Sequence, residues 1–130
     1  METRLSYRVY LEDTDQLGVV YYANYFKYFE RGRSEWLTAV TGHAVASFQQ
    51  SGILLVVHKV TATFRKPALL WDTIDVVSSF TVESPYRGQF KQRVERAGEL
   101  LVDAVIDLVA LDTNQNLVEL PPQLRVTPGA

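Results

Sequence analysis

The sequence contains no cysteine and only two histidines, which excludes several kinds of active site at once. Without cysteine there is no disulfide, no thiolate nucleophile and no zinc–thiolate site. His43 and His58 have no second histidine or cysteine at ligand spacing, so we expect no metal site. Gly-x-Ser-x-Gly, a Walker loop and Gly-x-Gly-x-x-Gly are also missing, which argues against a serine hydrolase and against nucleotide-cofactor folds. We therefore expect no cofactor.

Long apolar runs and strong charge are missing too. No apolar run approaches the ~18 residues that a membrane span requires, and the N-terminus has no apolar signal segment. The net charge of -2 gives no strong field toward nucleic acid or an anionic membrane. With 130 residues, 47% of them apolar, the sequence predicts one domain over residues 1–130 with a core of its own. We expect a cytoplasmic protein with no nucleic-acid partner and no membrane insertion.

The hydrophobic pattern predicts one strand, one long helix and then a series of strands. Alternation from Leu5 to Leu11 indicates a half-buried strand. Between Tyr22 and Thr41 the pattern changes to the helical period, and Gly42 is suited to end the helix. The predicted apolar face comprises Tyr22, Phe26, Phe29, Arg33, Trp36, Leu37 and Val40.

Strand candidates follow at residues 53–57, 59–64, 73–82, 90–96 and 100–111, and Pro121 opens a short segment that is irregular or one helical turn. Short turns join these candidates, so neighbouring strands are expected to be antiparallel. The order predicts an α+β fold in which a curved antiparallel sheet of five to six strands wraps around one long helix.

The most informative stretch runs from residue 12 to residue 25 and reads Glu-Asp-Thr-Asp-Gln-Leu-Gly-Val-Val-Tyr-Tyr-Ala-Asn-Tyr. Asp13 and Asp15 lie in a turn that Gly18 permits, and the turn leads directly into the predicted helix. A helix start presents free backbone N–H groups and a partial positive charge. A carboxylate that faces such donors across a bound carbonyl is suited to acyl transfer, because the donors stabilise the oxyanion.

The same stretch has two other interpretations. Either aspartate is also of the type that caps a helix or closes an Asx-turn. The spacing resembles an EF-hand as well, with Asp13, Asp15 and Gly18 at positions one, three and six. However, Leu17 stands at the fifth position and Asn24 at the twelfth, where a bidentate glutamate is required. Calcium is excluded on those two residues, whereas capping and catalysis both stay open.

The residues that surround this turn carry a resemblance. Residues 9–15, 18–22, 24–25 and 30–33 resemble the 4-hydroxybenzoyl-CoA thioesterase family of hotdog-fold enzymes. They are most similar to its bacterial acyl-CoA thioesterase branch, which is often linked to the Tol–Pal system. The resemblance covers nearly the whole chain and is strongest over residues 7–37. It implies a hotdog fold and the hydrolysis of an acyl-CoA to the free acid and coenzyme A.

The resemblance also implies roles for individual residues. Asp15, three residues before Gly18, corresponds to the catalytic acid, which acts either as nucleophile or as general base. Asp13 is expected to bond the amides of the turn. The backbone amide of Tyr22 corresponds to the oxyanion donor. Many members of the branch carry histidine at this position, whereas this chain carries tyrosine, so the amide role is kept and a histidine-assisted mechanism is not implied. Glu30 borders the apolar face of the helix; it is either a solvated ion-pair partner or, as the resemblance implies, a helix carboxylate that is catalytic or contacts the acyl group.

Coenzyme A carries phosphates, so its site should be locally basic. The resemblance assigns Arg87, in a turn between two strands, to the nucleotide end of coenzyme A, although a solvated turn charge is the simpler interpretation. Arg65 is a second basic candidate. Gly18, Val19 and Tyr25 complete the residues that are expected to contact substrate.

Two other functions remain open at this point: an acyl-carrier-protein thioesterase, and a hotdog protein that binds acyl-CoA without turnover. The sequence does not indicate acyl length, or an aromatic against an aliphatic acyl group. An open sheet edge invites pairing with a second copy. The resemblance implies a homodimer or homotetramer with active sites between subunits, where the Asp15 loop of one chain faces the Tyr22 helix start and strands shared with the other.

Overall fold

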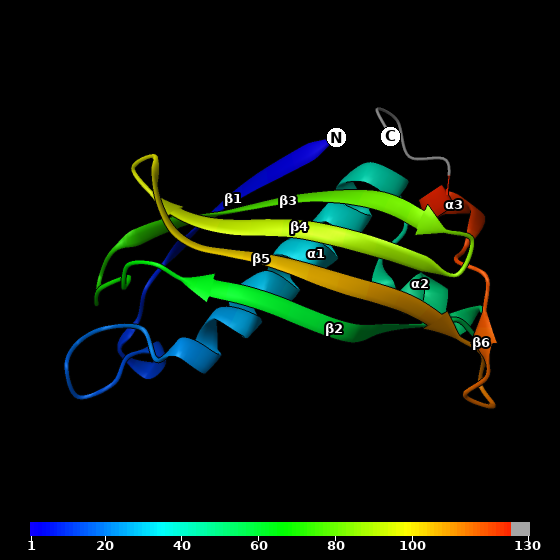
Figure 1. Ribbon diagram of the computed structural model, residues 1–130, viewed down its shortest axis with the longest axis horizontal. Helices are drawn as coiled ribbons and strands as arrows, with labels where there is room; N and C mark the ends of the chain where they lie inside the picture. Colours follow the sequence, from blue (N-terminus) through cyan, green and yellow to red (C-terminus); the bar gives the residue numbers. More distant parts are fainter. Residues whose placement is uncertain (126–130) are drawn as a thin grey trace.

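The computed structural model, which describes residues 1–125, places one long helix against one curved antiparallel sheet (Figure 1). The strands are β1 (Glu2–Arg8), β2 (Leu54–Phe64), β3 (Thr73–Ser84), β4 (Arg87–Arg96), β5 (Glu99–Leu111) and β6 (Leu117–Val118). Their order is β1-β3-β4-β5-β2, and β6 pairs with the end of β5. Every pair is antiparallel. The predicted α+β hotdog architecture is confirmed.

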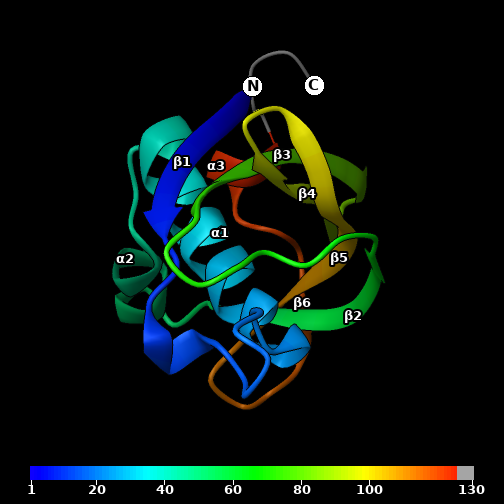
Figure 2. The same ribbon diagram turned by 90° about the vertical axis from the view of Figure 1, so that its left-hand side faces the viewer.

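The long helix α1 (Tyr25–Thr41) lies on one side of the sheet, which curls around it when viewed end-on (Figure 2). Gly32 brings the helix close to β3, because a Cβ at this position would lie only 2.8 Å from Cγ1 of Val76. The helix ends at Gly42, whose φ of 76° is left-handed and whose N–H donates to the Thr38 carbonyl. This C-terminus was predicted. The buried face consists of Tyr25, Tyr28, Phe29, Gly32, Trp36 and Leu37.

The start of the helix differs from the prediction. Residues 22–24 form a separate 3₁₀ turn, η2 (Tyr22–Asn24), and the regular helix begins at Tyr25. Tyr22 and Phe26 are therefore 57% and 41% exposed, whereas Tyr25 is buried. The periodicity misled here because aromatic residues occupy both faces of the first two turns, so either face could have been the buried one.

Strand boundaries differ as well. β1 occupies residues 2–8, and Leu11 lies exposed in a short 3₁₀ helix, η1 (Leu11–Asp13). The two strands predicted over residues 53–64 are a single strand, β2, with a register shift between Val57 and Lys59 that marks a bulge at His58. A short helix, α2 (Val45–Gln50), and β6 were not predicted. The terminal segment from Pro121, which was expected to be irregular or one helical turn, contains the short helix α3 (Pro122–Arg125).

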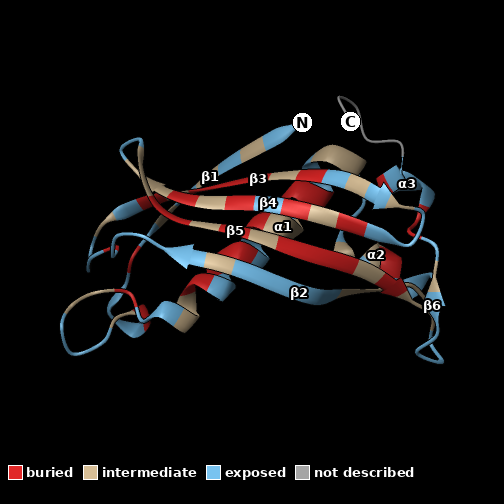
Figure 3. Ribbon diagram, in the orientation of Figure 1, coloured by how far each residue is buried: buried red, intermediate tan, exposed pale blue. Residues whose placement is uncertain are grey.

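The core lies between α1 and β3, β4 and β5, where buried residues alternate along β4 and also form short consecutive runs in β3 and β5 (Figure 3). β2 is different, because it pairs only with β5 and most of its residues are exposed. Val57, Val60 and Phe64 on this strand are each about 40% exposed. One long sheet edge with apolar side chains is thus open beside the helix. Among residues 1–125, no helix is long and apolar enough to cross a membrane.

Candidate active site

The acidic stretch forms a closed loop between η1 and η2. The Asp15 N–H donates to the Val19 carbonyl at 2.9 Å, and the Gly18 N–H donates to the Asp15 carbonyl at 3.1 Å. Thr14 and Val20 face each other in an isolated antiparallel bridge that closes the loop. Gly18 has a φ of 76°, so this turn requires the conformational freedom of glycine, as predicted.

Asp15 presents an exposed carboxylate from this loop. Its Oδ1 accepts the Leu17 N–H at 2.8 Å, which is an Asx-turn. Its Oδ2 accepts no hydrogen bond from residues 1–125. One oxygen therefore orients the carboxylate, and the other has no hydrogen-bond partner among the described residues.

Asp13 is only 4% exposed, and its carboxylate accepts no turn amide among residues 1–125. Its Oδ2 accepts the Tyr28 hydroxyl at 2.9 Å, and the Lys27 Nζ lies 3.6 Å from Oδ1. The prediction that Asp13 bonds turn amides through its side chain was wrong, because Asp15 fills that role. Burial, followed by the bond to Asp13, raises the pKa of Tyr28, so its hydroxyl remains a donor.

The backbone amide of Tyr22 is free to bind a ligand. The Tyr21 N–H donates to the Asp13 carbonyl at 3.0 Å, and the Asn24 N–H donates to the Tyr21 carbonyl at 2.8 Å. The Tyr22 N–H between them has no acceptor among residues 1–125. Because it lies in the first turn of a helical segment, it carries the partial positive charge of a helix N-terminus.

A cleft of about 230 Å³ is lined in part by Tyr22. The Phe64 ring at the end of β2 packs against Tyr22 and Tyr25, with centroid distances of 5.8 and 5.7 Å. The Tyr25 hydroxyl accepts the Ala68 N–H at 3.0 Å, so this residue lines the cleft with its ring and holds the exit of β2 with its oxygen. The complete lining is Val20, Tyr22, Tyr25, Phe64, Arg65, Lys66 and Pro67.

A second pocket, of about 200 Å³, lies farther along the same flank of α1. Glu30 is at its polar rim, where its Oε1 accepts the Ser34 hydroxyl at 2.8 Å. Arg33 donates to Oε1 of Gln92 at 3.0 Å, and burial lowers the pKa of Arg33. The remaining walls are apolar and consist of Leu37, Val45, Leu55, Val57, Phe90 and Leu108.

The two predicted basic residues have different surroundings. Arg65 borders the cleft, but its Nε donates to Asp103 at 2.8 Å, so its charge is already paired. Arg87 begins β4 at the other end of the sheet (Figure 1). It pairs with Val109, whereas Phe64 pairs with Val102, seven residues away along β5 and thus about 24 Å distant. One chain joins Asp15, Gly18 and Val19 in one hydrogen-bonded loop and places Tyr22 and Tyr25 in the cleft, but it leaves Arg87 remote.

Sequence reasoning missed Tyr28 and Phe64. Tyr25 and Tyr28 are three residues apart in a helix, which places both side chains on one face, so this signal was available. Phe64 carried no comparable signal, because its position beside the helix start depends on the long-range pairing of β2 with β5. Among residues 1–125, no cluster of three or more acidic, histidine or cysteine side chains could hold a metal ion.

The chain resembles known proteins in sequence and in structure. A family model described as the thioesterase-like superfamily matches residues 9–126. The acyl-CoA thioester hydrolase YbgC of Escherichia coli is 34% identical over 106 residues, covering 81% of this chain and 78% of that protein. The acyl-CoA thioesterase YbgC of Haemophilus influenzae is 30% identical over 105 residues, covering 81% and 77%. A crystal structure described as a probable thioesterase from Bartonella henselae superimposes with a TM-score of 0.87 and 28% identity, covering 93% of this chain and 100% of that one.

Proposed function

The chain belongs to the thioesterase-like superfamily and is a thioester hydrolase, and on that premise we propose that it cleaves an acyl-CoA to the free acid and coenzyme A. One observation supports the site most directly. A carboxylate with one unbonded oxygen, on Asp15, and an unbonded amide, on Tyr22, belong to one hydrogen-bonded loop-and-turn segment beside a cleft.

In the proposed reaction the thioester carbonyl oxygen accepts the Tyr22 N–H. Asp15 then acts by one of two routes. Either its Oδ2 attacks the carbonyl carbon and forms an acyl anhydride that water hydrolyses, or it takes a proton from a water that attacks the same carbon. In both routes the carbon–sulfur bond breaks and coenzyme A leaves as a thiolate, which needs no strong general acid. One oxyanion donor is typically worth about 10²–10³ in rate.

Glu30 is proposed to contact the distal part of the acyl group and not the reacting carbon. It lies eight residues beyond Tyr22, which corresponds to about 12 Å along the helical segment. It also borders the mainly apolar second pocket, whose mouth is on the same flank of α1. An acyl chain that leaves the carbonyl along this flank would reach the pocket.

The active unit is proposed to be a homodimer formed through β2, and two such dimers would form the homotetramer. The open edge of β2 and its exposed Val57, Val60 and Phe64 favour pairing with a second β2. A twofold axis near the middle of β2 reverses the second copy. Its Arg87 would then lie roughly three strand spacings, or ~14 Å, from Phe64 of the first chain. Arg87 would bind the nucleotide end of coenzyme A held by the other chain.

The proposal is tested by following thiol release from a panel of short, long and aromatic acyl-CoAs, alongside the same acyl groups on acyl-carrier protein and on a thioester without the nucleotide. Turnover of acyl-CoA in clear preference to the carrier-protein esters is expected. Preference for the carrier-protein esters would show that the substrate is an acyl-carrier-protein thioester and not an acyl-CoA. Saturable binding of acyl-CoA without thiol release would show that the protein binds acyl-CoA and does not hydrolyse it.

A further inference from the structure

Two buried tyrosine hydroxyls hold the segments on either side of the Asp15 loop. Tyr25 binds the Ala68 amide, and Ala68 in turn accepts the Val20 N–H through its carbonyl at 2.9 Å. Tyr28, one turn farther along α1, donates to the Asp13 carboxylate at 2.9 Å. The downstream end of the loop is thus tied to the exit of β2, and the upstream end is tied to the helix.

Asp13 connects the segment that carries the Asp15 carboxylate with the segment that carries the Tyr22 amide, the two groups of the proposed catalytic site. Its side chain is held by Tyr28, while its carbonyl accepts the Tyr21 N–H and an Asn24 Nδ2–H, both at 3.0 Å. Asp15 lies two residues after Asp13 in sequence, and Tyr22 lies between Tyr21 and Asn24. One residue therefore carries contacts to both sides of the Tyr22 amide and to the base of the Asp15 turn.

From these contacts we infer that Tyr28 and Asp13 are positioning residues, whose hydrogen bond fixes the Asp15 carboxylate relative to the Tyr22 amide; this inference rests on the proposed function. Displacement of a catalytic group by about 1 Å can cost about 10² in rate. Loss of the hydroxyl leaves the buried Asp13 carboxylate with Lys27 at 3.6 Å as its nearest cation, and Lys27 is itself largely exposed. The carboxylate then moves toward water and takes the base of the turn with it.

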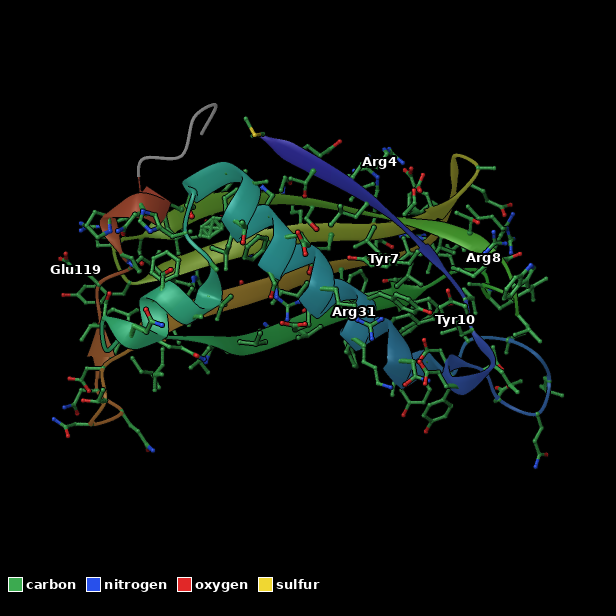
Figure 4. All side chains as sticks on the ribbon, turned by 180° about the vertical axis from the view of Figure 1, so that it is seen from behind. Arg4, Tyr7, Arg8, Tyr10, Arg31 and Glu119 are labelled. Carbon is green, nitrogen blue, oxygen red and sulfur yellow. The ribbon has the colours of Figure 1, made fainter. Side chains whose placement is uncertain are left out.

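The surroundings of Tyr28 argue against direct contact with substrate. Tyr28 and Asp13 line a cleft of about 460 Å³ on the β1 side of the helix, whereas Tyr22 lines the cleft beside Phe64. Tyr7 on β1 and Arg31 on α1, both labelled in Figure 4, also line the β1-side cleft. A thioester at the Tyr22 amide is thus separated from Tyr28 by the helix that carries it.

The decisive variant is Tyr28→Phe, which keeps the ring and removes only the hydroxyl. We expect kcat to fall 10- to 100-fold while KM for acyl-CoA changes less than about threefold. Tyr7→Phe is the matched control, because the Tyr7 ring lies 5.9 Å from that of Tyr28 and its hydroxyl makes no hydrogen bond within residues 1–125. This control should keep wild-type kcat. Rates are compared at a temperature well below the melting temperature of each variant, so that unfolding does not contribute.

Two Asp13 variants separate positioning from general stability. Asp13→Asn keeps an oxygen that accepts the Tyr28 hydroxyl and should retain most of kcat, whereas Asp13→Ala should lose as much as Tyr28→Phe. The double variant Asp13→Ala with Tyr28→Phe should lose no more than either single variant, because one bond is removed in each case.

Wild-type kcat in Tyr28→Phe, or a rise in KM alone, would overturn the inference, and so would multiplicative losses in the double variant. Asp15→Asn distinguishes these failures from a failure of the proposed function. If Asp15→Asn is inactive and Tyr28→Phe is normal, the function stands and the positioning role is wrong. If Asp15→Asn is active, both are wrong.

Discussion

In the proposed dimer each active site contains residues from both chains. Two variants that are each inactive or weakened should therefore regain activity when they are mixed. Asp15→Asn removes the reactive carboxylate, and Arg87→Ala removes the proposed phosphate contact. Within one chain Arg87 lies at the opposite end of the sheet from Phe64, which lines the cleft beside Tyr22, and the two positions are about 24 Å apart along β5. In the proposed dimer, Asp15 of each chain works with Arg87 of the other.

The size of the effect follows from counting sites. When the two variants are mixed in equal amounts and exchange freely, half of the dimers are mixed, and each mixed dimer contains one site with an intact Asp15 and an intact Arg87. About a quarter of all sites are then wild type. If each site used one chain alone, no intact site could form. Loss of a charged hydrogen bond of about 1.5–3 kcal/mol lowers kcat/KM roughly 10- to 150-fold, so this mixture would keep about 5% of wild-type activity or less.

The assay is thiol release at acyl-CoA concentrations well below KM, after co-refolding or prolonged incubation of the mixed variants. Exchange of chains is verified independently by mixing a tagged with an untagged wild-type protein. Recovery to about a quarter of wild-type activity is expected. Activity that remains at the average of the separate variants, while exchange is demonstrated, would refute both the shared site and the role of Arg87.

Two further predictions concern stability. Gly88→Ala should lower the free energy of unfolding by ~1–3 kcal/mol in a denaturant titration, because a Cβ there would overlap the Phe80 ring; an unchanged midpoint would contradict this packing. Hydrogen bonds from Arg93 and Arg4 lower the pKa of Glu95 from its ordinary 4.5. The contribution of the Glu95 carboxylate to folding stability is therefore fully present above pH 4.5 and is lost as the pH falls through the lowered pKa. The melting temperature of Glu95→Gln should therefore fall less steeply below pH 4.5 than that of the wild type, and parallel curves would show that these hydrogen bonds contribute nothing.

The architecture was predictable because periodicity and turn residues agreed over most of the chain. The end of α1 at Gly42 and the long strands on the C-terminal side needed only local rules. The start of α1 was not predictable in the same way, because aromatic side chains on both faces left the phase open. The bulge at His58 looked like a gap between two strands, since pairing with β5 is what makes residues 54–64 continuous.

The candidate site was predictable in its location and less so in its internal contacts. The spacing from Asp15 to Gly18 and the following helix start identified the loop from sequence. Spacing could not show that Asp15, and not Asp13, accepts the turn amide through its side chain, because either residue stands where it can do so. Only the packing of Tyr28 beneath the loop decides which carboxylate is buried.

The central claim is that the Asp15 carboxylate carries the hydrolysis, and single-turnover thiol release by Asp15→Asn tests it most directly. The substitution keeps the shape of the side chain, including an oxygen for the Leu17 amide, and removes the nucleophile and base. Glu12→Gln, an exposed neighbour on the same segment, is the matched control. We expect Asp15→Asn to bind acyl-CoA and release no measurable thiol, while Glu12→Gln matches the wild type. Wild-type kcat in Asp15→Asn would contradict the account.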